Sequence, residues 1–406
     1  MIHYMTSNGL GNAWVGNEIR VVKKASIPVV LHALWRADST FFSASDMVQA
    51  ESDTRVLYPL HAGSTFVSVV QAPFVFRGRF MSAAWNALTG QRESLTVRVK
   101  TIWHFLVACH WARTLRGEQI SLIHSQWIHS GGTVAMYGAW LLGASFSFTG
   151  HAADLFRERC ALRDKIARAR FIICISEFHR QFFLSEGARP EQLAIAYCGI
   201  DSSHFSPRSA PRAAGSRPRI LSSGRLVEKK GFLDLVDACK DLRDRGLDFE
   251  CVIAGSGPGE SGLRERIRLH GLEDRVVVTG QPLLQEKLPE VMHDADVYCL
   301  ACIRASDGDI DGLPQMLMEA MACGLPVVST RLVGIPDLVV HEQTGLLAEP
   351  NDARGLADCL QRLLQDAELS RSLARAGRDH VLQSFDLTTC LDPLIQRFRA
   401  ALHESP

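Results

Sequence analysis

The chain has 406 residues, which is long enough for two or three domains with large cores, and 47% of its residues are hydrophobic. Its 44 Lys and Arg residues balance 44 Asp and Glu residues, so bulk charge does not indicate a nucleic acid partner. The eleven cysteines are scattered mostly through apolar segments, as is typical of reduced thiols, and Met1–Thr6 lacks the basic start and long apolar core of a signal peptide. We therefore expect a cytoplasmic protein.

Strand-like and helical segments alternate along both halves of the chain. The strand-like runs are near residues 2–6, 28–34, 55–58, 121–124, 146–149 and 171–175, and then at about 219–222, 250–254, 275–278, 297–300 and 326–329. This alternation predicts an α/β fold with parallel sheets, right-handed crossovers and helices on both faces. We expect domains at 1–205 and 218–385, joined by a basic, Pro-rich linker at 206–217 and followed by an amphipathic segment at 386–406.

A glycine-rich loop follows the first predicted strand. Gly9 and Gly11 lie in this loop, ahead of a helical stretch at 14–24. Glycines let the backbone approach a ligand closely, but a pair of them is a weak signal, so both residues are candidates only.

The segment Thr65–Phe80 is apolar and then basic, and Pro73 and Arg77 interrupt it, so it is too short to span a bilayer. We favour the core of the first domain, because core packing explains most apolar stretches. The alternative is contact with an anionic membrane surface, assisted by neighbours such as Trp85 and Lys100, which would receive a lipid-linked acceptor.

Three polar positions follow predicted strands near the end of the first half. His151 and Asp154 lie in the loop after the strand at 146–149. A lone histidine is more often structural than catalytic, and Asp154 suits a helix cap as well as a substrate contact. Further on, Ser176 fits a helix N-cap, and Arg180 lies one turn into the same predicted helix.

The first strand of the second half leads into a basic loop that carries Arg225, Lys229 and Lys230 before a helix opens after Gly231. In open α/β sheets ligands bind at the carboxyl ends of strands, where helix N-termini favour phosphate. Arg225 and Lys230 could therefore neutralise a diphosphate without a metal. The alternative is a solvated basic loop.

Two carboxylates stand eight positions apart in the segment from Asp311 to Glu319. Pro314 suits the first position of a helix, and Gly324 ends it. Because this helix has no polar face, we expect it to be buried, and a buried carboxylate needs a specific partner. A structural Glu–Arg pair and a sugar-nucleotide site are both open on this segment alone, and the basic loop upstream favours the sugar-nucleotide site.

Two further motifs predict structure rather than chemistry. The glycines at 255, 257 and 259 do not have the spacing of a dinucleotide fingerprint and predict a strand-to-helix turn. Cys299 and Cys302 form a CxxC inside a predicted buried strand, with no second CxxC or spaced histidine pair, so zinc or redox chemistry is a minor alternative.

Several ordered motifs together resemble the retaining family 4 glycosyltransferases of GT-B fold, particularly enzymes of bacterial surface polysaccharide assembly. They are Gly-Arg-Leu-Val-Glu-Lys-Lys-Gly at 224–231, Ala-Gly-Ser-Gly-Pro-Gly at 254–259, Asp-Gly-Leu-Pro-x4-Glu-Ala-Met-Ala at 311–322, Gly-Ile-Pro-Asp-Leu-Val at 334–339 and Thr-Gly-Leu-Leu at 344–347. The resemblance implies two Rossmann-like domains that face a cleft, with the C-terminal segment packing back on the first domain.

The resemblance also implies roles for residues of the second half. Arg225 and Lys230 would hold the donor diphosphate, and Glu319 the nucleotide ribose. Asp311 would contact the transferred sugar, beside the backbone amides of Gly312 and Leu313. The family pattern usually has Glu at the first acid, so Asp311 is one methylene shorter.

In the first half the resemblance implies that His151 lines the sugar site and faces the carboxylate helix. The loop with Gly9 and Gly11 would lie beside donor and acceptor, and Arg180 would face the donor phosphates.

The implied activity is retaining transfer of a hexose-type sugar from a nucleotide diphosphate sugar to an acceptor hydroxyl in exopolysaccharide, capsule or lipopolysaccharide assembly. The implied partners are this donor and a saccharide or lipid-linked acceptor, with no cofactor, no metal and no nucleic acid, and with contact to the inner face of the membrane as an option. A nucleotide-sugar epimerase of related fold and a non-catalytic GT-B scaffold are the alternatives. Epimerised donor formed without acceptor would indicate the first, and slow donor hydrolysis would exclude the second.

Overall fold

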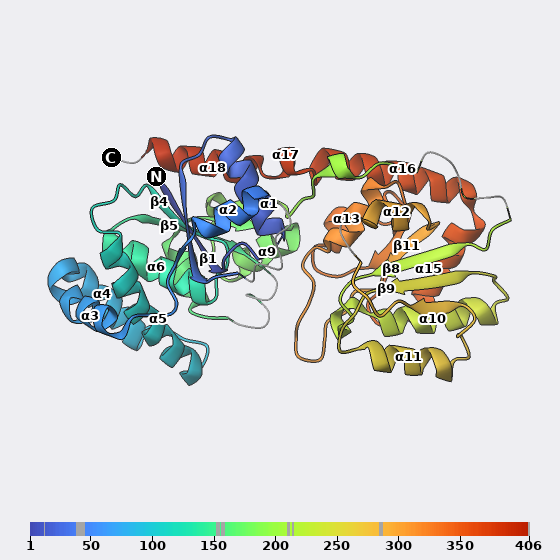
Figure 1. Cartoon of the computed structure of the whole chain (residues 1–406), viewed down its shortest axis with the longest axis horizontal. Coiled ribbons are helices and arrows are strands. Elements are labelled where there is room, and N and C mark those ends of the chain that lie inside the picture. The colour runs from blue at the N-terminus through green and yellow to red at the C-terminus, as the bar shows by residue number, and fades with distance from the viewer. Residues whose placement is uncertain are drawn as a thin grey trace. The chain divides into compact units, whose positions relative to one another are not determined.

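The computed structural model describes residues 1–11, 13–37, 45–151, 155, 159–208, 212, 215–283 and 287–404. The chain forms two compact units (Figure 1). One unit comprises Met1–Tyr197 together with Leu391–Pro406, and the other comprises Cys198–Cys390. The chain thus leaves the first unit eight residues before the predicted boundary at 205 and returns to it at Leu391, where 386 was predicted.

The first unit is built on a seven-stranded parallel sheet with the order β3-β2-β1-β4-β5-β6-β7. Its strands are β1 Ile2–Asn8, β2 Val29–Trp35, β3 Arg55–Val56, β4 Leu122–Ser125, β5 Ser145–Gly150, β6 Ala169–Cys174 and β7 Leu193–Ile195. The six strands predicted from the sequence are confirmed. Strand β7 was missed because its sequence, Leu-Ala-Ile, has a single β-branched residue and does not stand out as a strand.

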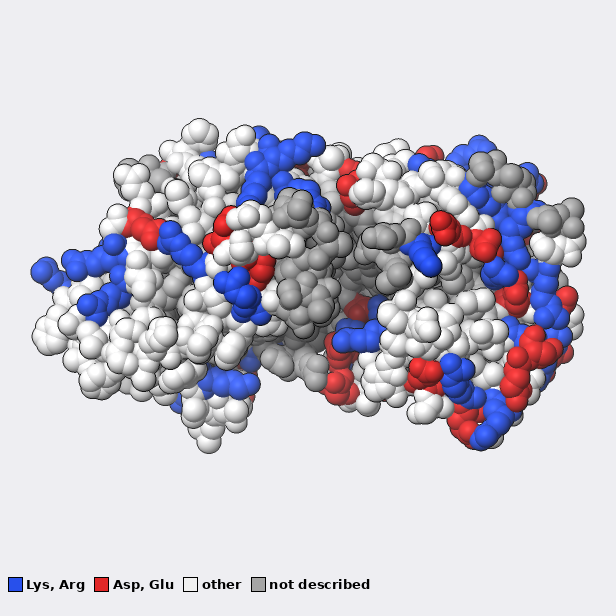
Figure 2. All heavy atoms as spheres, viewed as in Figure 1, with Lys and Arg blue, Asp and Glu red and all other residues white. Residues whose placement is uncertain are grey.

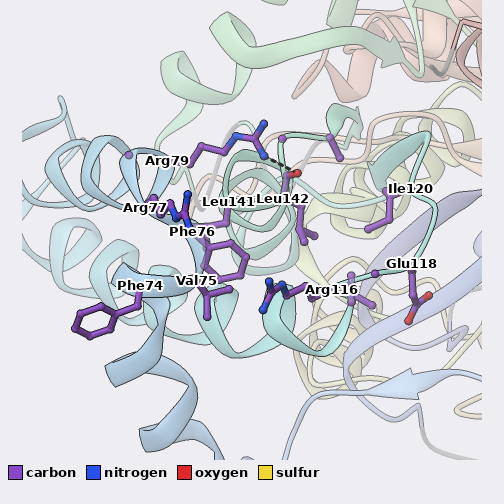
Figure 3. A pocket seen from close by; sticks show the side chains of 15 residues that line it. Phe74, Val75, Phe76, Arg77, Arg79, Arg116, Glu118, Ile120, Leu141 and Leu142 are labelled. Carbon is purple, nitrogen blue, oxygen red and sulfur yellow. Dashed lines mark hydrogen bonds between the residues drawn. The ribbon is translucent and has the colours of Figure 1, made fainter.

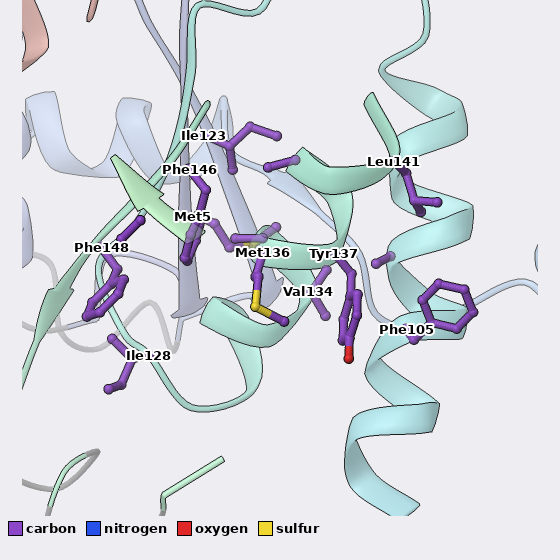
Figure 4. Packing of buried hydrophobic residues seen from close by; sticks show 14 of the residues in the cluster. Met5, Phe105, Ile123, Ile128, Val134, Met136, Tyr137, Leu141, Phe146 and Phe148 are labelled. Carbon is purple, nitrogen blue, oxygen red and sulfur yellow. The ribbon is translucent and has the colours of Figure 1, made fainter. Parts of the chain in front are cut away.

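Helices cover this sheet and supply most of its core. They are α1 Ala13–Lys24, α2 Ser45–Ser52, α3 Ala62–Phe76, α4 Gly78–Thr89, α5 Leu95–Thr114, α6 Ser130–Leu142, α8 Leu162–Arg168, α9 Glu177–Ser185 and α18 Asp392–His403, with a short 3-10 turn at Pro190–Gln192. Figure 4 shows Phe146 and Phe148 of β5 packed near Met136 of α6, with Tyr137 turned toward Phe105 of α5. Strands buried on both faces need such continuous apolar runs.

The last helix belongs to the first unit. Helix α18 packs against β4 and β7. Its Phe398 is fully buried, and the Phe398 ring lies with its centroid 5.0 Å from that of His124 and 6.3 Å from that of Phe171. The core of this unit therefore includes a side chain from the very end of the chain.

The second unit is built on a six-stranded parallel sheet with the order β10-β9-β8-β11-β12-β13. Its strands are β8 Arg219–Ser223, β9 Glu250–Ala254, β10 Val276–Val278, β11 Val297–Leu300, β12 Val327–Thr330 and β13 Leu346–Ala348. The five predicted strands are confirmed, and β13 is again a three-residue strand that was missed. The strand order reverses between β8 and β11, and in open α/β sheets such a reversal is where ligands bind.

The helices of the second unit lie on both faces of its sheet. They are α10 Phe232–Asp244, α11 Glu260–Leu269, α12 Leu288–His293, α13 Gln315–Ala322, α14 Ile335–Leu338, α15 Ala353–Gln365, α16 Ala367–Ser384 and α17 Leu387–Cys390, with 3-10 turns at Ser202–His204 and Glu228–Lys230. In Figure 1, α10 and α11 lie on one side of β8 and β9, and α12 and α13 lie on the other. Pro314 was predicted at the first helical position, but it precedes α13 with ψ 117°, because its extended backbone forms the cap.

The predicted core role of Thr65–Phe80 is only half right. Ala72 and Phe76 are buried, but the side chains of Phe66 and Phe74 are 70% and 80% exposed. The prediction failed because α3 is apolar on both of its sides, and composition alone does not decide which side meets the core. Among the described residues, no helix is both long and apolar enough to cross a membrane.

Candidate functional site

The loop after β8 presents Arg225 at the carboxyl edge of the second sheet. The Gly224 amide donates to the Ala254 carbonyl at 3.0 Å, and the Leu226 amide donates to the Ser256 carbonyl at 2.9 Å, so the loop is held on both sides of Arg225. The Arg225 carbonyl accepts from the Val227 amide at 2.8 Å, but the exposed Arg225 side chain forms no hydrogen bond or ion pair with any residue that the structure describes. Its guanidinium group is therefore available to a ligand.

The glycine turn after β9 supports this loop. A Cβ atom at Gly255 would come within 1.9 Å of the Gly224 carbonyl oxygen, and Gly257 has φ +156°. The predicted strand-to-helix turn is confirmed, because this segment joins β9 to α11. Its glycines allow two backbone loops to touch.

Close backbone packing also fixes the two lysines. Gly231 has φ +65°, and a Cβ atom there would lie 1.7 Å from the Ala301 carbonyl oxygen. The Ile303 amide donates to the Lys229 carbonyl at 3.0 Å. The 3-10 turn that carries Lys229 and Lys230 is therefore attached to the loop that follows β11.

The Asp311 carboxylate binds both lysines. Lys230 Nζ lies 2.5 Å from Asp311 Oδ2, and Lys229 Nζ lies 3.0 Å from Asp311 Oδ1 and 3.2 Å from Asp309 Oδ2. The three side chains that meet at Asp311 are only 13 to 16% exposed. Burial opposes ionisation of Asp311, but Lys230 and Lys229 outweigh it and hold the pKa of the carboxyl below its ordinary value of 3.8. Burial likewise opposes the charge of Lys230, and Asp311 raises the Lys230 pKa above 10.5.

Two unused backbone donors lie directly after Asp311. The Gly312 carbonyl accepts from the Gly334 amide at 3.0 Å, which joins this turn to the loop after β12. Within the described part of the chain, the amides of Gly312 and Leu313 donate to no acceptor. Val333 has φ +47°, a conformation that is unfavourable for a β-branched residue and that recurs at functional sites.

Glu319 is buried in α13, as predicted, with 4% of its surface exposed. Its charge influences Tyr298 of β11 electrostatically. The Tyr298 hydroxyl lies 3.1 Å from Ser223 Oγ at the end of β8. Burial first, and then the Glu319 carboxylate, raises the pKa of the Tyr298 hydroxyl. Glu319 thus lies behind the ends of the two strands that flank the reversal of strand order.

In the first unit, His151 follows β5 directly and is 6% exposed. Its ring centroid lies 4.2 Å from that of Trp14 and 4.7 Å from that of Trp127, and its Nε2 lies 3.3 Å from Gln126 Nε2. Burial first, and then the neighbouring His179 and other histidines, lower the pKa of His151 to about 3. The imidazole is therefore neutral at physiological pH.

A buried carboxyl group that the sequence reasoning missed lies in the same network. Glu18 of α1 accepts from the Tyr4 hydroxyl at 2.6 Å and from Gln126 Nε2 at 3.2 Å. Burial raises the Glu18 pKa to about 7, although both hydrogen bonds act in the opposite direction. A signal was present, because Glu18 lies on the same helical face as Val15 and Val22.

The glycine-rich loop after β1 encloses another carboxylate. Glu51 accepts from the Leu10 amide at 2.8 Å and from the Ala37 amide at 2.9 Å. A Cβ atom at Gly9, which has φ +51°, would lie 2.4 Å from Glu51 Oε1. Gly9 therefore has a structural role. The Gly11 amide donates to the Asn8 carbonyl at 3.3 Å. Contact of either glycine with a ligand stays a prediction.

The remaining candidates of the first unit have local partners. Arg180 lies 2.7 Å from Glu177 within α9, and its proposed contact with phosphate stays a prediction. Ser176 is confirmed as the cap of this helix, since its hydroxyl accepts from the His179 amide at 3.3 Å. Asp154 lies outside the described residues.

All eleven cysteines lie in the described part of the chain, and none of them is in a disulfide. Cys299 and Cys302 are buried, and Cys302 Sγ lies 3.9 Å from Asp311 Oδ2. Within the described ranges, no three His, Cys, Asp or Glu side chains are grouped as metal ligands.

Two family models match consecutive parts of the chain. Residues 82–204 match Glycosyltransferase Family 4, and residues 207–380 match Glycosyl transferases group 1. The colanic acid biosynthesis glycosyltransferase WcaL of Escherichia coli K12 is 37% identical over 220 residues, which is 54% of each chain. The amylovoran biosynthesis glycosyltransferase AmsK of Erwinia amylovora is 37% identical over 223 residues, 53% of this chain and 54% of that one. The match thus spans about half the length of these relatives.

Solved structures share the fold over the whole chain. A glycosyltransferase from Rickettsia africae superposes with a TM-score of 0.73 at 16% identity, covering 100% of this chain and 99% of that one. Anabaena Alr3699/HepE in complex with UDP-glucose superposes with a TM-score of 0.69 at 17% identity and 99% coverage of both. These structures and the two parallel sheets show the GT-B fold. The two family models, which between them match residues 82–204 and 207–380, show that the chain belongs to the family 4 glycosyltransferases.

Proposed function

We propose that this protein transfers a hexose-type sugar from a nucleotide diphosphate sugar to an acceptor hydroxyl with retention of the anomeric configuration. The observation that carries the proposal is the set of groups at the strand reversal of the second unit. Among the described residues, the Arg225 side chain has no partner, the Lys230 ammonium group pairs with the Asp311 carboxylate alone, and the Gly312 and Leu313 amides beside Asp311 donate to no acceptor. Such a set of donors suits a diphosphate.

In this proposal the cations stabilise the leaving group. As the bond between the anomeric carbon and the diphosphate oxygen breaks, negative charge grows on the diphosphate, and Arg225 and Lys230 lie ready to neutralise it. The acceptor oxygen forms its new bond on the same face of the sugar, and its proton passes to a phosphate oxygen of the donor. Asp311 and the amides of Gly312 and Leu313 position the sugar, and Glu319 binds the ribose.

For the first unit we propose that His151 binds a hydroxyl of a saccharide. Its neutral imidazole can donate and accept hydrogen bonds, and the half-buried Trp14 and Trp127 beside it offer the aromatic walls common in small-molecule sites.

The biological setting is proposed from the relatives. WcaL and AmsK are named for colanic acid and amylovoran biosynthesis. A relative from Mycobacterium tuberculosis, 32% identical over 215 residues, is named as a GDP-mannose-dependent phosphatidylinositol monomannoside mannosyltransferase. We therefore propose a role in exopolysaccharide, capsule or lipopolysaccharide assembly, with a saccharide or a lipid-linked saccharide as acceptor.

The donor can be identified by thermal shift with UDP, GDP, ADP and their sugars, because a ligand that binds only the folded state raises Tm with its concentration. Lys230→Ala should weaken binding of the best nucleotide diphosphate and abolish turnover while the fold remains. Lys240→Ala is the control, since Lys240 is an exposed lysine of α10 that pairs with Asp244 at 2.8 Å. Wild-type affinity in Lys230→Ala would contradict the assignment.

The stereochemistry of the transfer and its dependence on metal ions are tested by separate measurements. We expect NMR of the product to show the anomeric configuration of the donor, and inversion would exclude the same-face route. Turnover should survive EDTA, because Arg225 and Lys230 supply the positive charge, and loss of activity restored by a divalent cation would show that they do not suffice.

A further inference from the structure

Helices α3, α4 and α5 each carry a stripe of exposed apolar side chains. On α3 the stripe is Phe66, Val70 and Phe74, on α4 it is Met81, Trp85 and Leu88, and on α5 it is Leu95, Val99 and Trp103. The spacing of three or four residues places each stripe along one helical face. The exposed fractions run from 49% for Trp103 to 82% for Leu95.

These stripes point away from the core of the unit. On α3 the buried residues are Ser68, Ala72 and Phe76, two positions after each member of the exposed stripe. Two positions correspond to about 200° around a helix, which is the opposite side. Helix α4 follows the same rule, with Ala83 and Ala87 buried. The three helices pack on one another, and we call their exposed stripes together the α3–α5 face.

The charge of this region differs from that of the whole chain. Between residues 62 and 114 there are six Lys and Arg residues and a single carboxylate, Glu93, against a balance of 44 and 44 overall. The Glu93 carboxylate already accepts two hydrogen bonds, from the Ala161 and Leu162 amides at 3.1 and 3.2 Å. Figure 2 shows basic side chains projecting from the part of the first unit where Figure 1 places α3 and α4.

A pocket of about 970 Å³ opens beside this face, where α3 meets α4 (Figure 3). Arg77, Arg79 and Arg116 surround it, and Phe76, Ile120 and Leu142 are among its apolar walls. Glu118 also lines the pocket, but Arg55 binds its carboxylate at 2.7 Å. Among the described residues, Arg77 and Arg116 form no ion pair, so the pocket combines free guanidinium groups with apolar surface.

We propose that the α3–α5 face docks on an anionic phospholipid bilayer, with the arginine pocket receiving a lipid phosphate. Apolar side chains that enter the interface beside cations are the features by which peripheral helices bind such surfaces, and Trp85 and Trp103 suit the headgroup region. Arginine binds phosphate oxygens through its planar fork.

A second copy of the chain fits this surface less well than a bilayer. A symmetric dimer would place the face against itself and bring Arg77 and Lys100 toward the same cations of the partner. Apposed like charges oppose association, whereas an anionic bilayer complements the cations and the apolar stripes together. The proposal does not depend on sugar transfer, so binding and turnover can fail separately.

The test is co-flotation of the full chain with vesicles of phosphatidylcholine alone or phosphatidylcholine mixed with phosphatidylglycerol. We expect binding to the mixed vesicles that weakens with salt. Each cation near the surface contributes roughly fivefold, so the triple variant Arg77→Ser, Lys100→Ser, Arg116→Ser should bind on the order of a hundredfold more weakly. The control Arg268→Ser, Arg331→Ser, Arg362→Ser removes three exposed arginines of the second unit and should bind like wild type.

Two triple variants test the contribution of the apolar stripes, one on the α3–α5 face and one as a control in the second unit. Phe66→Ser, Phe74→Ser, Trp85→Ser should abolish flotation, and Leu233→Ser, Leu269→Ser, Val277→Ser, at exposed apolar positions of the second unit, should leave it unchanged. All these sites are exposed, so Tm should stay that of wild type. If a triple variant lowers Tm, the single variants Phe74→Ser and Lys100→Ser replace it.

A second measurement is independent of affinity. Brominated phosphatidylcholine in the mixed vesicles should quench tryptophan fluorescence, and Trp85→Phe combined with Trp103→Phe should remove that quenching. Absence of wild-type binding to the mixed vesicles overturns the proposal. So does a dimer in solution that the apolar triple variant dissociates, because the face would then be a protein interface.

Discussion

At the scale of single residues, Asp311 is the most constrained group of the donor site. Its carboxylate bridges two ammonium groups in a site that is mostly closed to water. A diphosphate that binds Lys230 must compete with this carboxylate. The sequence predicted both residues but not their contact, because spacing along the chain does not show that the loops after β8 and β11 meet.

The first prediction concerns Asp311→Asn. Breaking a buried ion pair should lower the free energy of unfolding by about 3 kcal/mol at pH 7, measured by urea denaturation. Because the folded-state pKa of Asp311 lies below 3.8, the wild-type contribution is complete above that pH and is lost as pH falls through the folded-state pKa. Asp358→Asn, which removes an exposed partner of Arg245, should cost less than about 1 kcal/mol. Equal losses in the two variants would show that Asp311 is not a buried partner.

Glu18 is the second residue whose protonation matters. The Tyr4 hydroxyl has one proton but faces two acceptors, Glu18 Oε1 and the Gln126 side-chain oxygen. A protonated Glu18 supplies the missing donor, which agrees with its raised pKa.

We therefore predict that Glu18→Gln stabilises the protein at alkaline pH. The amide can donate to Tyr4 and accept from Gln126, so the network stays satisfied. In wild type the unfolded carboxyl ionises above 4.5 and the folded one only above about 7, so stability falls between these values by about 3 kcal/mol. The difference between variant and wild type, measured by urea denaturation, should grow from about 1 kcal/mol at pH 5 to about 3 kcal/mol at pH 8. A difference independent of pH would contradict it.

At the scale of elements, the donor site depends on glycines that let loops touch. Gly231 ends the turn with Lys230 and begins α10, in contact with the Ala301 carbonyl. Its left-handed conformation and the lack of space for a Cβ atom are separate constraints.

Replacement of two glycines separates these constraints. Gly231→Ala should destabilise the protein by well over 2 kcal/mol and weaken nucleotide diphosphate binding, since the helix must shift away from Ala301. Gly246→Ala has a similar φ of +79° but open space around its Cβ, so it should cost about 1 kcal/mol and leave binding unchanged. Thermal unfolding and calorimetric titration measure the two effects. Equal costs would show that only the backbone conformation matters.

Much of the architecture was predictable from patterns of elements. The long strands, the α13 helix and the buried position of Glu319 followed from apolar runs and from the Gly and Pro residues that bound them. The edge strand β13 was not predictable, because Leu-Leu-Ala has no β-branched residue, whereas the equally short β10 is Val-Val-Val and was predicted. The exposed side of α3 was not predictable either, since an apolar helix face carries no mark of whether it meets core or solvent.

At the scale of the whole molecule, buried histidines are confined to one of the two units. Six histidines are buried in the first unit, namely His3, His32, His104, His124, His151 and His179, and their pKa values are lowered to about 3 or about 4, mainly by burial. Within the described residues, the second unit buries none. Below pH 6.5 these histidines bind protons in the unfolded chain, but in the folded first unit they stay neutral until the pH is much lower.

We predict that mild acid unfolds the first unit before the second. Each buried histidine should reduce stability by roughly 2 kcal/mol at pH 5, and Glu18 alone acts in the opposite direction. Hydrogen exchange with mass spectrometry should show peptides from 1–197 losing protection between about pH 6.5 and pH 5, while peptides from 219–384 stay protected. Simultaneous loss in both units would contradict the prediction.

The return of α18 to the first unit has a consequence for synthesis. Because Phe398 packs against both His124 and Phe171, the core of the first unit is incomplete until residues 392–403 leave the ribosome. The second unit, by contrast, is contained in one uninterrupted stretch and can fold while the chain is still being made. In a nascent chain the domain encoded first is therefore the one finished last, and a premature stop after residue 390 damages the amino-terminal half.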